Sequence, residues 1–63
     1  MSNIYLVEFD FAGFGCRRVV VADNDVQARE VSNLTDIATI ESVKKIGIAD
    51  EGVEIGIVCA EEP

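Results

Sequence analysis

The chain has 63 residues, enough for a single small domain spanning residues 1–63, and its hydrophobic content of 49% excludes a disordered chain. Its formal net charge is -7, with 12 acidic and 5 basic residues, which disfavours direct binding to nucleic acid because phosphates are bound by Lys and Arg. No apolar run approaches the roughly 20 residues needed to cross a membrane. Because the first residues also lack the basic segment of a signal peptide, we expect a cytoplasmic protein.

The first two predicted elements are β-strands joined by a tight turn. Residues 4–11 alternate between an apolar face and a second face that begins apolar and ends acidic. Residues 16–23 contain three consecutive valines, which favour a strand over a helix. The intervening "AGFG" supplies glycines for a hairpin turn.

After residue 23 the spacing of apolar residues changes to that of a helix, and further along the chain it returns to that of strands. Asn24 is a predicted N-cap, with Gln27 as its capping-box partner, and the helix is expected over residues 25–33. After an irregular connector at residues 35–40, strands are expected at residues 40–49 and 53–62, separated by the turn "DEG". The order ββαββ predicts an α+β fold: a four-stranded antiparallel sheet in the order 2-1-3-4, with one short helix on one face.

The second face of this sheet is expected to carry apolar side chains. One short helix cannot cover all of Val20, Ile4, Leu6 and either Val43 or Ile46. Exposed apolar area of this kind is typical of an interface. A homodimer that packs sheet to sheet is one explanation of it.

The residues offer little for catalysis or for binding a metal or cofactor, and no cofactor is expected. The chain has no histidine, and its two cysteines are too few for a structural zinc site. In the order 2-1-3-4, Cys16 and Cys59 lie on opposite edges, roughly 14 Å apart, so no internal disulfide is expected. Val53, Ile55, Ile57 and Cys59 are expected on one face of the last strand, and Cys59 is predicted to be a small core residue. Cys16 is either an ordinary strand cysteine or a thiol made reactive by Arg17 and Arg18.

The stretch "FAGFGCRR" at residues 11–18 is interpreted as the hairpin tip. A dinucleotide-binding loop needs a third glycine, where this chain has Arg18, and a following helix, where a strand is predicted. Phe14, with Arg17 and Arg18 nearby, has the composition of an interaction hot spot. The alternative is that Phe14 folds back onto the sheet edge or into a second copy. Acidic residues predicted to contribute to protein binding are Glu8, Asp10, Asp23, Asp25, Asp50, Glu51 and Glu54.

The chain resembles small phage-encoded inhibitors of host enzymes, particularly the short RNA-polymerase inhibitor of podoviruses. In that family a hairpin precedes one helix, which precedes another strand, and the matching segments here are "YLVEFDF", "RRVVVADNDVQAREVS" and "IESVKKIG". This chain is similar in kind to small acidic anti-CRISPR and anti-restriction proteins as well. The resemblance covers about two thirds of the chain, and the strand "VEIGIVCAEE" departs from it. It implies a non-enzymatic protein that blocks a host machine in the host cytoplasm, with acidic groups taking the place of nucleic acid.

Three functions remain open from the sequence. The first is a binding module that docks on a larger, basic, nucleic-acid-handling protein and modulates or inhibits it, without contacting nucleic acid or membrane itself. The second is a structural homodimer with no separate target. The third, a thiol-based enzyme built on Cys16, is disfavoured by the absence of a histidine to act as base.

Overall fold

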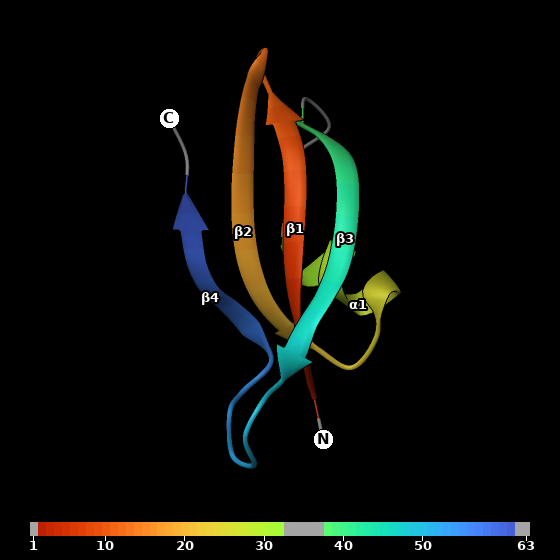
Figure 1. Ribbon diagram of the computed structural model, residues 1–63, viewed down its shortest axis with the longest axis vertical. Helices are drawn as coiled ribbons and strands as arrows, with labels where there is room; N and C mark the ends of the chain where they lie inside the picture. Colours follow the sequence, from red (N-terminus) through yellow and green to blue (C-terminus); the bar gives the residue numbers. More distant parts are fainter. Residues whose placement is uncertain (1, 33–37, 62–63) are drawn as a thin grey trace.

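The computed structural model describes residues 2–32 and 38–61 and shows an α+β fold (Figure 1). Its elements are β1 (Asn3–Phe11), β2 (Phe14–Ala22), α1 (Asp25–Val31), β3 (Ala38–Ile48) and β4 (Gly56–Glu61). The four strands form one antiparallel sheet, and α1 lies across one face of it. The predicted fold class is confirmed. Of the predicted connector, residues 35–37 lie outside the described residues, and the rest is not irregular, because β3 already begins at Ala38.

The β1–β2 hairpin turns on two residues, Ala12 and Gly13. Both have positive φ, 54° and 84°, as the tightest hairpin turns require. The Asp10 side chain accepts a hydrogen bond of 2.9 Å from the Gly13 amide, which fixes the turn. Residues 14 and 15 therefore belong to β2, and the predicted hairpin is confirmed with a tighter tip than expected.

The helix begins at the predicted cap. The Asn24 side chain accepts a 2.8 Å hydrogen bond from the Gln27 amide. The Gln27 side chain reaches back to the Asp23 amide at 2.6 Å, one residue before the position a capping box usually uses. With only seven residues, α1 depends on packing against the sheet for its stability.

The core lies between α1 and the sheet. It consists of Tyr5, Val7 and Phe9 from β1, Cys16, Val20 and Ala22 from β2, and Ala28 from α1. Val43 packs against its margin. Each large side chain buried here contributes roughly 1.5–3 kcal/mol. Of the residues expected on the second face, Val20 is therefore in the core, whereas Ile4 and Leu6 do lie on the other face, opposite Val21 and Val19.

The predicted strand order 2-1-3-4 is wrong, because the sheet has the order β3-β1-β2-β4. The turn "DEG" does form, with the Val53 amide donating to the Asp50 carbonyl at 3.2 Å. The chain then continues through Ile55 and crosses to the far edge of the sheet, where β4 pairs with β2 (Figure 1). Both orders give β4 the same direction, so the choice depends on side chains. The valines of β2 offer β4 an apolar neighbour, whereas β3 carries Lys44 and Lys45.

The predicted faces of the last strand also need correction. A register shift between Val19 and Val20 places Cys59 opposite Val19 and Ile57 opposite Val20. Since Val19 and Val20 lie on opposite faces of the sheet, Ile57 and Cys59 do so as well. The expected alternation of residues 53–59 on one face fails at this bulge, which leaves Val58 as the extra residue.

Candidate protein-interaction surface

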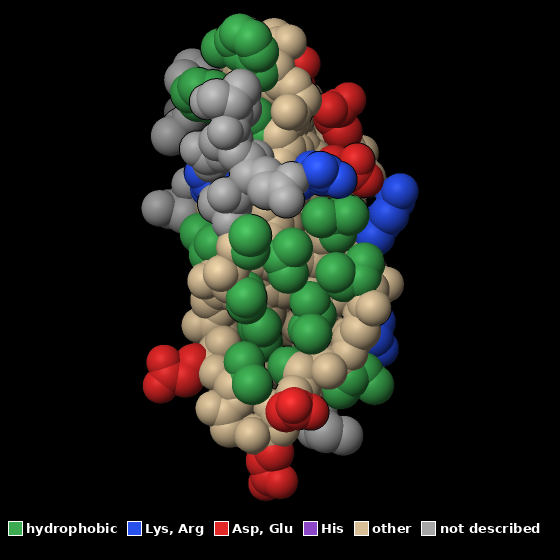
Figure 2. All heavy atoms as spheres, turned by 60° about the vertical axis from the view of Figure 1, so that its left-hand side comes forward, with side chains coloured by type: hydrophobic (Ala, Val, Ile, Leu, Met, Phe, Trp, Pro, Cys, Tyr) green, Lys and Arg blue, Asp and Glu red, His purple; other side chains and the backbone are tan. Residues whose placement is uncertain are grey.

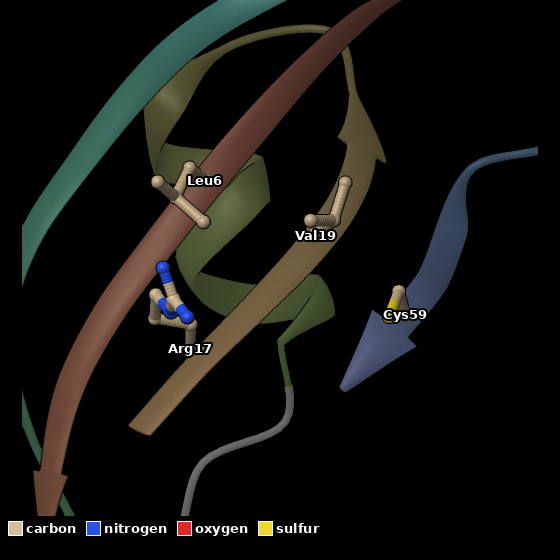
Figure 3. A pocket seen from close by; sticks show the side chains of 4 residues that line it. All are labelled: Leu6, Arg17, Val19 and Cys59. Carbon is tan, nitrogen blue, oxygen red and sulfur yellow. The ribbon is translucent and has the colours of Figure 1, made fainter. Parts of the chain in front are cut away.

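We call the sheet face opposite α1 the open face. It carries a shallow pocket of about 190 Å³ between β1, β2 and β4, lined by Leu6, Arg17, Val19 and Cys59. Figure 3 shows these four side chains on the near side of the sheet with α1 behind it. The apolar lining comes from three strands that are consecutive in the sheet but not in the sequence. The pocket therefore exists only because β4 lies beside β2.

The apolar surface continues from the pocket onto β4 and the segment before it. Val53, Ile55, Ile57 and Val58 are between 44% and 63% exposed. The main contacts of α1 are with β1, β2 and β3, so even Ile57, on the helix side of the sheet, stays exposed. Figure 2 shows hydrophobic side chains gathered in the middle of the surface on this side of the molecule. We call Val53, Ile55, Ile57, Val58 and Cys59 the β4 patch; it wraps the outer edge of the sheet, with Cys59 on the open face and Ile57 on the helix side.

Carboxylates gather at the end of the sheet where β2 and β3 finish and β4 begins. Segments 22–28 and 46–56 carry all of them and contain no Lys or Arg. Ser2 connects the two segments: its hydroxyl donates to Asp23 at 3.0 Å, and its carbonyl accepts from the Ala49 amide at 2.9 Å. The exposed residues of this acidic end are Asp23, Asp25, Asp50, Glu51 and Glu54. Acidic side chains are visible below the apolar surface in Figure 2.

The two remaining acidic candidates lie apart from this end and have local partners. Glu8 forms an ion pair of 3.4 Å with Lys44 on β3 and accepts a 3.1 Å hydrogen bond from Ser42. Asp10 holds the hairpin turn, as described above. The structure therefore brings together five of the seven predicted acidic residues and gives the other two local roles within the sheet.

Phe14, Arg17 and Arg18 do not form one surface. Phe14 is 58% exposed and opens β2 directly opposite Phe11, which is 39% exposed. Arg17 lies opposite Glu8 on the open face. Arg18 points to the helix side, where it donates a hydrogen bond to the Ser32 carbonyl and places its guanidinium 5.3 Å from the centre of the Phe9 ring. Of the three, only Phe14 and Arg17 keep an exposed side chain.

The two cysteines lie on opposite faces of the sheet. Cys16 is 5% exposed within the core, and its Sγ lies 3.6 Å from the Phe14 carbonyl oxygen. Cys59 is exposed in the β4 patch, so its predicted place in the core is wrong. The predicted separation across the whole sheet is also wrong, because their strands are neighbours. They are kept apart by the sheet itself.

Two kinds of feature are absent from residues 2–32 and 38–61. No group of three or more His, Cys, Asp or Glu side chains is placed to hold a metal ion within these ranges. Among the same residues, no helix has the length and hydrophobicity needed to cross a bilayer.

No protein-family model matches this chain, and neither a curated protein nor a solved structure matches it. The candidate surface therefore depends on the geometry alone. Sequence reasoning missed the β4 patch because it placed the last strand beside β3 with regular alternation. The signal available was the apolar run 55–59, which contains no charged residue.

Proposed function

We propose that this chain is a non-enzymatic protein-interaction module that docks on a larger, basic protein through the open face and the β4 patch. The observation that carries the proposal is the position of the β4 patch beside the acidic end. Large exposed apolar patches with a polar rim are typical of protein interfaces. A basic partner is favoured because the patch is bordered by Glu51 and Glu54 in a chain of net charge -7.

The finer proposal is inhibition or modulation of a nucleic-acid-handling protein, with the protein encoded by a phage or mobile element. Proteins that bind nucleic acid present basic surfaces to phosphate. The carboxylates of the acidic end lie on two segments held together through Ser2, so they form an array of negative charge at one end of the sheet. Such an array can compete with phosphates for the same basic surface.

The test is affinity capture from a bacterial lysate at low and high salt. Wild-type protein is expected to retain a basic protein at low salt and to release it as salt rises. Cys59→Lys is expected to lose this protein, because it places a charge in the pocket, whereas Val26→Lys on the exposed side of α1 is expected to keep it. Equal retention by both variants would contradict docking through the open face.

A homodimer is the second candidate, favoured by the apolar pocket on the open face. It predicts a dimer in sedimentation velocity that Cys59→Lys dissociates and Val26→Lys leaves intact. A monomer at all concentrations would exclude this candidate.

A further inference from the structure

We propose that the outer edge of β4 binds an extended, antiparallel segment of the partner that has an apolar centre and basic residues near its end. This inference rests on the proposed function and names the chemistry of the partner. It starts from the strand order, which makes β3 and β4 the two edges of the sheet. A strand at the edge of a sheet presents backbone N–H and C=O groups that can pair with another chain.

The two edge strands differ in whether their side chains oppose or permit pairing with an added strand. β3 carries Glu41, Lys44 and Lys45, all exposed. Register shifts occur at both edges, two in the pairing of β3 and one, at Val58, in that of β4, so the charged side chains make the difference. Charged residues on an edge strand, lysine above all, oppose strand addition. The residues of β4 from Gly56 to Cys59 are uncharged, and Val58 is 63% exposed. Strand addition is therefore opposed at β3 and permitted at β4.

Charge favours a basic segment over a second copy of β4. A second copy would bring its own net charge of -7 to this edge. Two strongly acidic surfaces repel one another, which disfavours pairing of two copies. A partner segment with Lys or Arg near the position of Glu54 and Glu51 gains ion pairs instead, and its apolar centre covers the β4 patch.

The test uses random peptides displayed on beads and selected on the intact chain. The enriched peptides are expected to alternate apolar residues and to carry Lys or Arg at the end that meets Glu54. Val58→Lys is expected to weaken their binding about tenfold or more. Val26→Lys adds the same charge at an equally exposed valine, 61% against 63%, and is expected to leave binding unchanged.

Two methylated versions of a selected peptide distinguish backbone pairing from side-chain docking. One carries methyl groups on one set of alternate backbone amides, and the other carries them on the remaining set. In an antiparallel ladder, only every second amide of the peptide faces β4. One methylated peptide is therefore expected to bind like the parent, and the other to bind about tenfold or more weakly, because it loses ladder hydrogen bonds.

Three results would overturn strand addition: no selected peptide, equal binding of the two methylated peptides, or binding that survives Val58→Lys. If lysate capture still retains a basic protein in any of these cases, the proposed function stands and only the strand addition fails. Loss of both capture and peptide binding contradicts both. A dimer that Val58→Lys dissociates would show that a second copy occupies the edge.

Discussion

Cys59 lies directly opposite Val19 across the pairing of β4 with β2. This pair joins the last strand to the first hairpin and completes the pocket of the open face. It also determines which strands form the edges of the sheet, and thus which edge is available to a partner.

The pairing predicts a cross-strand disulfide between Cys59 and a cysteine introduced as Val19→Cys. Residues directly opposite in an antiparallel pair have Cα atoms about 4.5–5.5 Å apart, within the range of a disulfide. Mass spectrometry after mild oxidation should detect the bridge. Lys44→Cys is the control: it lies on the far edge, about 14 Å away across three strand spacings, and should stay unbridged. A bridge to position 44 but not to 19 would contradict the strand order.

The hairpin turn predicts that Ala12→Asn stabilises the protein. Ala12 has φ of 54°, a conformation that Asn adopts more easily than Ala and that precedes Gly in the commonest hairpin turns. The free energy of unfolding in urea should rise by roughly 0.5–1 kcal/mol. Ala12→Val should lower it, because β-branched side chains tolerate positive φ poorly. The opposite order of the two variants would be inconsistent with this turn.

The helix cap predicts a measurable loss of stability for Asn24→Ala. The Asn24 side chain accepts the Gln27 amide, and removing such a cap costs about 1 kcal/mol. Asn24→Ser preserves an acceptor at the same position and should remain close to wild type. Urea unfolding of the two variants checks the prediction, which fails if both lose the same stability.

Arg18 is predicted to stabilise the contact between α1 and the sheet. Arg18→Ala removes the hydrogen bond to the Ser32 carbonyl and the contact with the Phe9 ring, so the free energy of unfolding should fall by about 1–2 kcal/mol. Arg17→Ala removes the same charge from the exposed neighbour on the other face and should cost less. Thermal unfolding of the two variants decides the matter; a larger loss for Arg17→Ala would contradict a structural role for Arg18.

Local signals predicted much of the fold. The alternation in β1, the valines of β2 and the cap at Asn24 each depend on residues close together in the sequence, and each is confirmed. The strand order is different, because the turn after Asp50 is compatible with β4 beside either β3 or β2. A single extra residue, Val58, then placed Ile57 and Cys59 on opposite faces of the sheet, although regular alternation predicts one shared face. Sequence alternation alone cannot reveal such a bulge.

The candidate site was predicted in part for the same reason. Asp23 and Asp25 follow β2, while Asp50, Glu51 and Glu54 follow β3. Because β2 and β3 are both antiparallel to β1, they finish at the same end of the sheet, which brings these residues together. The separation of Arg17 from Arg18 follows from simple strand alternation. The prediction that groups Phe14, Arg17 and Arg18 did not take this alternation into account.

The central claim is that the acidic end, together with the β4 patch, docks on a basic protein. Its most direct test is the salt dependence of the dissociation constant for the captured partner. Glu51→Lys with Glu54→Lys is compared with Glu30→Lys and Glu41→Lys, which change the net charge equally at exposed positions on α1 and β3. We predict that the first pair weakens binding about tenfold or more at low salt and flattens the salt dependence, while the second pair has a smaller effect. Equal effects of the two pairs, or binding independent of salt, would contradict the account.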